Sequence, residues 1–185
     1  MKYRWFYTSR NKLVLAGKNA QQNEQLVKKA EKKAIILHTK APGSPFCILK
    51  GKITAQDIRE AAIFCACFSQ GWKKKKKEME VHVFKGEQIL KEKRQKAGTF
   101  SVLGRVQKAR IKLQLGIKIQ KKKIRAVPII QKTRYLIFLR PGKIPKEKTA
   151  GKIKEILEKK RYKFTREEIL QAIPSGGFLI KEIKK

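Results

Sequence analysis

The chain has few acidic residues. It carries 14 Asp and Glu against 48 Lys and Arg, which gives a net charge of +34 at pH 7 and a pI near 10.4. Asp57 is the only aspartate, and the interval from Glu92 to Glu147 contains no acidic residue and 17 basic ones. Two-metal phosphoryl transfer requires clustered carboxylates, so the composition argues against such an enzyme. We expect no catalytic residue, and Asp57 is better explained as a first-turn helix residue that interacts favourably with the helix dipole.

Cysteine, histidine and long apolar stretches are also scarce. Cys47, Cys65 and Cys67 cannot all pair with one another, which favours a reducing compartment. Together with the two histidines they show no zinc-binding spacing. The longest apolar run, residues 61–68, is far shorter than the roughly 20 residues of a membrane-spanning helix. The aromatic start of the chain does not resemble a signal peptide. We therefore expect a cytoplasmic protein with no metal and no other cofactor.

The basic charge indicates the class of partner. The positive charges of a compact protein with this imbalance repel one another, so a polyanionic binding partner is expected. A surface suited only to solubility needs far less charge, with both signs interspersed. Membrane surfaces also attract Lys-rich proteins, but no long amphipathic helix with a wide apolar face is evident. The sequence predicts a nucleic-acid or ribosome partner and no membrane partner.

Periodicity and turn residues predict an α+β fold, with a mixed or antiparallel sheet and two main helices. Residues 4–8 and 13–16 read as a hairpin. Asn19 is a good N-cap for a helix over 20–32, because its side chain can accept a bond from a first-turn amide. Thr54 caps a second helix whose apolar residues recur at steps of three and four, as expected for a helix with one buried face.

A nearly all-cationic stretch at residues 120–125 is the best domain boundary. It predicts a first domain over residues 1–120 and a small basic α+β extension over residues 121–185. In the extension we expect a turn at Arg140-Pro-Gly, a helix over 149–160, and a further helix opened by the capping-box pattern at Thr165.

Residues 5–24 carry the most specific pattern, W-F-x-x-S-x-x-x-L-V-x-x-G-K-N-A-x-x-N-E. Over these twenty residues, without a gap, the chain resembles the opening of the NFACT-R domain. That domain is an RNA-binding module of ribosome-quality-control proteins and of small standalone proteins.

The resemblance continues to about residue 119. The strand ending in His38, followed by Pro-Gly-Ser44, is similar to the family's strand and loop, and Ser69 to Trp72 resembles the family's S-x-x-W. Fragments of the extension, Arg140-Pro-Gly among them, resemble archaeal-type members. Departures are Ala34, where an acidic residue is usual, and Arg94, near a usual glycine. Because no NFACT amino-terminal domain is seen, elongation of stalled chains is not implied.

Candidate binding residues combine basic groups with groups placed by the resemblance. Trp5 and Trp72 are either base-stacking platforms or core residues, and Lys73–Lys77 is either a phosphate clamp or a solvated loop. His38 either holds its loop or contacts a phosphate or base. The full set of nucleic-acid-binding candidates is Trp5, Lys18, Asn19, Asn23, His38, Ser44, Trp72, Lys73, Lys74, Lys75, Lys76, Lys77, Lys91, Arg105 and Arg110.

The sequence therefore predicts an RNA-binding protein of the translation apparatus that is not an enzyme. Its expected partner is tRNA or ribosomal RNA, with the ribosome itself as a further candidate, and a link to ribosome-associated quality control follows from the resemblance. One alternative is an enzyme or accessory subunit in tRNA modification such as thiolation. Another is a sequence-blind DNA-binding nucleoid protein.

Overall fold

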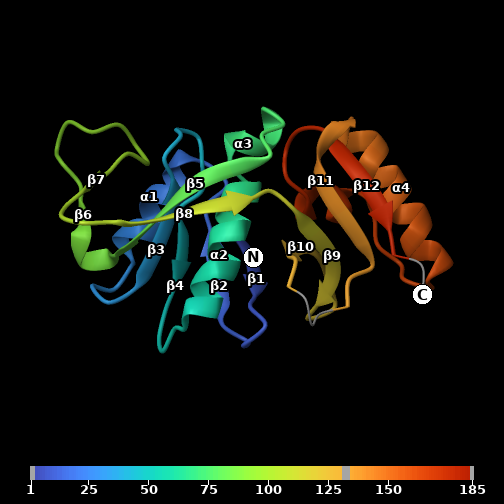
Figure 1. Ribbon diagram of the computed structural model, residues 1–185, viewed down its shortest axis with the longest axis horizontal. Coiled ribbons are helices and arrows are strands. Elements are labelled where there is room, and N and C mark those ends of the chain that lie inside the picture. The colour runs from blue at the N-terminus through green and yellow to red at the C-terminus, as the bar shows by residue number, and fades with distance from the viewer. Residues whose placement is uncertain (1–2, 131–133, 184–185) are drawn as a thin grey trace.

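The computed structural model describes residues 3–130 and 134–183, which form an α+β fold with antiparallel strand pairing (Figure 1). The first sheet has the spatial order β1 (Arg4–Tyr7), β2 (Leu13–Ala16), β4 (Cys47–Leu49), β3 (Ile35–Thr39), β5 (Glu78–Lys85) and β8 (Gln107–Lys112). The second has the order β10 (Lys123–Pro128), β9 (Leu115–Gln120), β11 (Ile137–Ile144) and β12 (Phe178–Glu182). A separate ribbon pairs β6 (Ile89–Leu90) with β7 (Ser101–Val102). The helices are α1 (Ala20–Lys28), α2 (Ala55–Cys67), α3 (Gln70–Lys73), α4 (Lys146–Lys159) and α5 (Arg166–Ala172), with a 3-10 turn η1 (Gly86–Gln88).

The first sheet is covered on both faces. Successive side chains of a strand point to opposite faces, so Ile36 and Leu37 of β3 enter different apolar clusters. Leu37 packs in the cluster that contains α2, whereas Ile36 packs with Phe46, Phe84 and residues of α1. The α1 face therefore has its own small core, and a groove opens beside it.

The two sheets share the larger core. Phe6 of β1, residues of α2, Leu115 of β9 and Phe178 of β12 belong to one buried cluster, and α2 lies between the two sheets (Figure 1). Hydrogen bonds also cross the junction. The Tyr7 N–H donates to Gln120 Oε1 at 2.9 Å, and Gln120 Nε2 donates to the Tyr7 carbonyl at 2.7 Å.

Local signals in the sequence placed most helix starts correctly. Asn19 caps α1 by accepting from the Gln22 N–H at 2.9 Å, and Thr54 with Asp57 forms a capping box at α2. The predicted hairpin is confirmed. The first helix is shorter than predicted and ends at Lys28 rather than residue 32.

Two features of the C-terminal part differ from the sequence-based expectation. The predicted turn at Arg140-Pro-Gly is wrong, because these residues lie inside β11. A register shift between Pro141 and Ile144 absorbs the proline, as bulges in strands commonly do. The expected boundary at 120/121 falls in the turn between β9 and β10, and the change from one sheet to the other occurs between Lys112 and Leu115.

Within residues 3–130 and 134–183, every helix is too short or too polar to cross a bilayer.

Candidate nucleic-acid interface

An open groove of about 620 Å³ lies on the α1 face of the first sheet. We call it the α1 groove. Its walls are the start of α1, the loop from Lys40 to Pro45, α3, and the segment from Ala97 to Val102. Six predicted binding residues line it: Lys18, Asn19, Asn23, His38, Ser44 and Lys73. The fold therefore brings together residues from β3, α1, α3 and their loops that are up to 55 positions apart.

The floor of the groove is aromatic. The His38 ring stacks on Phe46 with 4.2 Å between ring centroids, and Phe100 meets Phe46 edge-on at 5.3 Å. Burial lowers the pKa of His38 from 6.5 to about 4, although hydrogen bonds with the backbone of Ser44 and Thr39 act in the opposite direction. His38 is therefore neutral at pH 7. It adds no positive charge to the groove.

Basic side chains surround this floor. Arg4, Lys18, Lys40 and Lys73 line the groove, and none of its lining residues, all of which lie in the described part of the chain, is acidic. Arg4 is fixed in place, since its Nη1 donates to the Gly17 carbonyl at 3.0 Å and its guanidinium lies 5.2 Å from the Phe68 ring. Such a concave basic surface attracts phosphate groups.

The start of α1 adds to the positive potential. The Lys18 N–H donates to Gln22 Oε1 at 3.1 Å, in addition to the Asn19 cap. The first turn of α1 carries no acidic residue, so no carboxylate opposes the positive end of the helix dipole where it meets the groove. Asn19 thus acts first as the helix cap, and it is exposed where it lines the groove.

Asn23 and Ser44 shape the wall. Asn23 Nδ2 donates to the Ser44 carbonyl at 3.2 Å, and Asn23 Oδ1 accepts from the Phe46 N–H at 3.1 Å. Ser44 Oγ forms a short hydrogen bond with Thr39 Oγ1 and donates to the Ala41 carbonyl at 3.0 Å. Both residues are buried. Their polar atoms are therefore used to hold the loop in the shape that forms the groove.

Lys91, predicted to contact nucleic acid, anchors the neighbouring segment. Its Nζ donates to Glu24 Oε2 at 3.1 Å, to the Lys96 carbonyl at 2.8 Å and to the Thr99 carbonyl at 3.1 Å. These acceptors use the three N–H donors of an ammonium group. Glu24 also accepts from the Gly98 N–H, and this bond, followed by those from Lys28 and Lys91, lowers the Glu24 pKa to about 2. The Nζ of Lys91 is therefore engaged within the protein, and its contact with nucleic acid stays a prediction.

Neither predicted tryptophan presents a free face. Trp72 is fully buried, its Nε1 donates to the Gly177 carbonyl at 3.1 Å, and its ring packs on Phe178. Trp5 is 6% exposed and its ring is covered by Arg125, whose guanidinium lies 4.0 Å from the ring centroid. The prediction of stacking platforms at these two residues is therefore wrong, because the second sheet covers both.

The lysine run begins at the groove, where Lys73 is a lining residue. All five lysines are exposed; Lys73 ends α3, and Lys74–Lys77 lie in the connection to β5. Lys76 and Arg110 line a neighbouring depression of about 470 Å³ that shares Lys40 with the α1 groove. Arg110 is ion-paired with Glu78 at 2.8 Å. Arg105 is exposed but lies outside both depressions. The roles of these residues in binding stay predictions.

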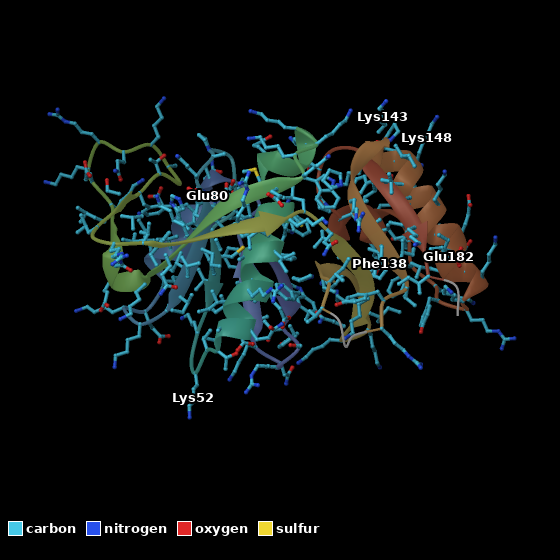
Figure 2. All side chains as sticks on the ribbon, in the orientation of Figure 1. Lys52, Glu80, Phe138, Lys143, Lys148 and Glu182 are labelled. Carbon is cyan, nitrogen blue, oxygen red and sulfur yellow. The ribbon has the colours of Figure 1, made fainter. Side chains whose placement is uncertain are left out.

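Basic side chains extend from every visible side of the molecule (Figure 2). Charge alone therefore does not single out a site, and the α1 groove is distinguished by concave shape, aromatic floor and absence of lining carboxylates. Sequence reasoning missed Arg4, Lys40, His82 and Phe100 in this groove. His82 lies opposite His38 only because β3 and β5 pair in that register.

The groups that could support chemistry are held in structural roles. Asp57 accepts from Thr8 Oγ1 at 2.6 Å and from the Thr54 N–H at 3.0 Å. The three cysteines are buried, and burial raises the pKa of Cys47 and Cys67. In the described residues no three His, Cys, Asp or Glu side chains gather as metal ligands would.

A basic groove with an aromatic floor, set on an antiparallel sheet, is the arrangement of an α+β nucleic-acid-binding domain. Residues 2–104, more than half of the chain, match the family described as the NFACT protein RNA binding domain. The chain belongs to this family of RNA-binding domains, as its sequence motifs predicted.

Individual relatives are consistent with this assignment. The chain is 32% identical over 181 residues to the "Archaeal Rqc2 homolog aRqcH" of Methanocaldococcus jannaschii, a match that covers 89% of this chain and 27% of the relative. It is 32% identical over 76 residues to the human "Ribosome quality control complex subunit NEMF", covering 38% of this chain and 7% of that protein. The chain thus spans about a quarter of the archaeal relative's length.

A solved structure supports the fold. The C-terminal part of the fibronectin/fibrinogen-binding protein from Streptococcus suis superimposes with a TM-score of 0.56 at 20% identity. The match covers 61% of this chain and 46% of that one. At this level of identity the likeness concerns the fold.

Proposed function

We propose that the protein binds structured RNA of the translation apparatus, a tRNA or ribosomal RNA of the large subunit, in the α1 groove. The observation that carries the proposal is the joint lining of this groove by Arg4, Lys18, Lys40 and Lys73 around the stacked pair of His38 and Phe46. Its volume of about 620 Å³ falls within the range of about 300–1,000 Å³ that small ligands such as a nucleotide occupy.

The basic side chains of the groove contact RNA phosphates, and the aromatic floor contacts a base. Lys18, Lys40 and Lys73 attract the backbone phosphates, which position an RNA without reading its sequence. An unpaired base then packs against the aromatic floor beside the neutral His38.

We further propose an association with the ribosome in the cytoplasm, in ribosome-associated quality control. Support comes from the archaeal relative, whose name places it among Rqc2 homologues and whose match includes nearly all of this chain. That match covers 27% of the relative, so the activity of the whole relative is not carried over.

We also propose that binding involves no covalent step. Burial raises the pKa of Cys47 and Cys67, which disfavours the thiolate that sulfur transfer requires. His38 is packed on Phe46 rather than paired with a nucleophile. Incubation with tRNA followed by nucleoside mass spectrometry tests this proposal. A stoichiometric change in any nucleoside would identify an enzyme of tRNA modification instead.

The RNA-binding proposal is tested by affinity measurements on matched variants. Lys18→Gln/Lys73→Gln removes two groove charges, and Lys52→Gln/Lys159→Gln removes two exposed charges outside the groove (Lys52 is labelled in Figure 2). We expect the groove variant to lose about tenfold in tRNA affinity, or about 1.4 kcal/mol, and the control to lose much less. Equal losses would mean that overall charge, and not the groove, determines binding.

Competition with duplex DNA and a variant of the aromatic floor complete the test of RNA binding. Duplex DNA added at equal phosphate concentration should displace tRNA poorly, because a groove with stacking rings favours unpaired bases. His38→Ala should weaken RNA binding by about 1 kcal/mol, the net contribution of one typical contact of this kind. Equal competition by DNA would support a sequence-blind DNA-binding protein.

A further inference from the structure

A second, smaller depression adjoins the α1 groove where β1 meets β10. Its volume is about 110 Å³, and Arg4, Lys18 and Phe68 line both hollows. We call it the Arg125 site, after the residue that lies on the Trp5 ring at its base. Lys123 of β10 and Glu168 of α5 also line it.

Arg125 has an unused hydrogen-bond donor. Its Nη1 donates to the Ile124 carbonyl at 2.7 Å, and its guanidinium lies 4.0 Å from the centroid of the Trp5 ring. Its Nε is buried and has no hydrogen-bond partner among the described residues. An unpaired N–H of a guanidinium group is costly to bury, so a ligand that accepts from it would relieve this cost.

The surrounding charges favour an anion as that ligand. Arg4, Lys18 and Lys123 line the site with Arg125, against the single carboxylate of Glu168. Glu168 caps α5, because its Oε2 accepts from the Thr165 N–H at 2.9 Å, and its negative charge opposes in part the lowering of the Arg125 pKa by burial. The four cations of the site still outnumber this one acid.

The size of the site favours a phosphate group over a base or nucleotide. A volume of about 110 Å³ lies below the range of about 300–1,000 Å³ for small-molecule pockets. It corresponds to the space of about four water molecules at roughly 30 Å³ each. Arg also presents its donors in a planar fork that suits phosphate oxygens.

We propose that the Arg125 site binds one phosphodiester of the RNA backbone, adjacent to the nucleotides in the α1 groove. The strand passes Lys18, which lines both hollows. This inference rests on the proposed function, since it assumes an RNA in the α1 groove. The fold adds to that function a fixed point for the backbone at the junction of the two sheets.

The first test is the salt dependence of tRNA affinity. Arg125→Gln and, separately, the exposed Lys123→Gln should each lower the slope of log affinity against log salt by about 0.7–0.9, the loss of one phosphate contact. Arg125→Gln should also weaken binding about tenfold at constant salt. Arg59→Gln is the matched control, because Arg59 is exposed on α2 and lines neither hollow.

The second test uses the unaltered protein and does not depend on the folding of a variant. The Arg125 Nε–H resonance is followed by NMR during titration with inorganic phosphate and with a 5′-phosphorylated RNA trinucleotide. We expect a saturable shift with both probes, and a larger affinity for the trinucleotide. The Arg59 Nε–H resonance should not move.

The outcomes separate the two proposals. If tRNA binds and the groove variant weakens it, but Arg125→Gln keeps the slope and the Arg125 resonance is unmoved, the inference is overturned and the proposed function stands. If the unaltered protein binds no RNA, the proposed function falls, and the phosphodiester assignment falls with it.

Discussion

Acidification should destabilise the protein through His38. Burial against Phe46 lowers the His38 pKa from 6.5 to about 4 in the folded state, whereas the unfolded chain protonates near the ordinary value. Between these pKa values the unfolded state binds more protons, so stability falls as the pH falls. The full difference corresponds to about 3 kcal/mol, and about 2 kcal/mol of it is lost between pH 7 and pH 5.

The assay is urea unfolding at pH 7 and pH 5, for the unaltered protein and for His38→Gln. Other groups titrate in both proteins, so the difference between the two pH-dependent losses isolates His38. We expect the unaltered protein to lose about 2 kcal/mol more than the variant. His82→Gln is the control, because His82 lies opposite His38 in the β3–β5 register, and it should retain most of the loss. Equal losses in His38→Gln and the unaltered protein would refute the reasoning.

Three further predictions follow from charge and from the wall of the groove. If 6–10 phosphates are contacted, RNA affinity should fall about 10³–10⁵-fold between 50 and 200 mM salt, and a flat log–log plot would contradict a charge-driven interface. Changing Lys73–Lys77 to Ser should weaken all RNAs alike and leave unfolding within about 0.5 kcal/mol, as chemical denaturation can check. The matched control changes five exposed lysines outside the groove to Ser, namely Lys32, Lys33, Lys52, Lys152 and Lys159. If the Lys73–Lys77 variant and this control bind RNA with equal affinity, the run has no specific role in binding. Asn23→Ala leaves the Phe46 N–H and the Ser44 carbonyl without their partner and should cost about 1–3 kcal/mol in unfolding free energy; an unchanged melting temperature would show that the loop does not need this link.

Features encoded within a few residues could be predicted from the sequence. The caps at Asn19 and Thr54 and the first hairpin depend on contacts over three to twelve positions. Lys18, His38 and Ser44 were placed by the family motifs, and the structure brings them together at one groove.

Features that depend on distant partners could not be predicted. Trp72 packs on Phe178 and donates its indole N–H to Gly177, 105 positions later, and Trp5 is covered by Arg125. The local sequence, a lysine run beside a tryptophan, does not determine whether the indole ring is exposed or buried in the core. Pro141 suggested a turn, but the bulge that accommodates it in β11 is set by pairing with β12.

The family match ends before β8, although β8 is a strand of the first sheet. The family match ends at residue 104, whereas β8 begins at Gln107 and pairs with β5, the strand that carries His82 into the groove. A fragment ending at Gly104 would leave the edge of β5 without a partner, and open edges of this kind promote aggregation. It would also uncover Phe6 and Trp72, which share their cluster with the second sheet. The unit that folds therefore extends beyond residue 104, to β8 and to the residues of the second sheet that cover these side chains.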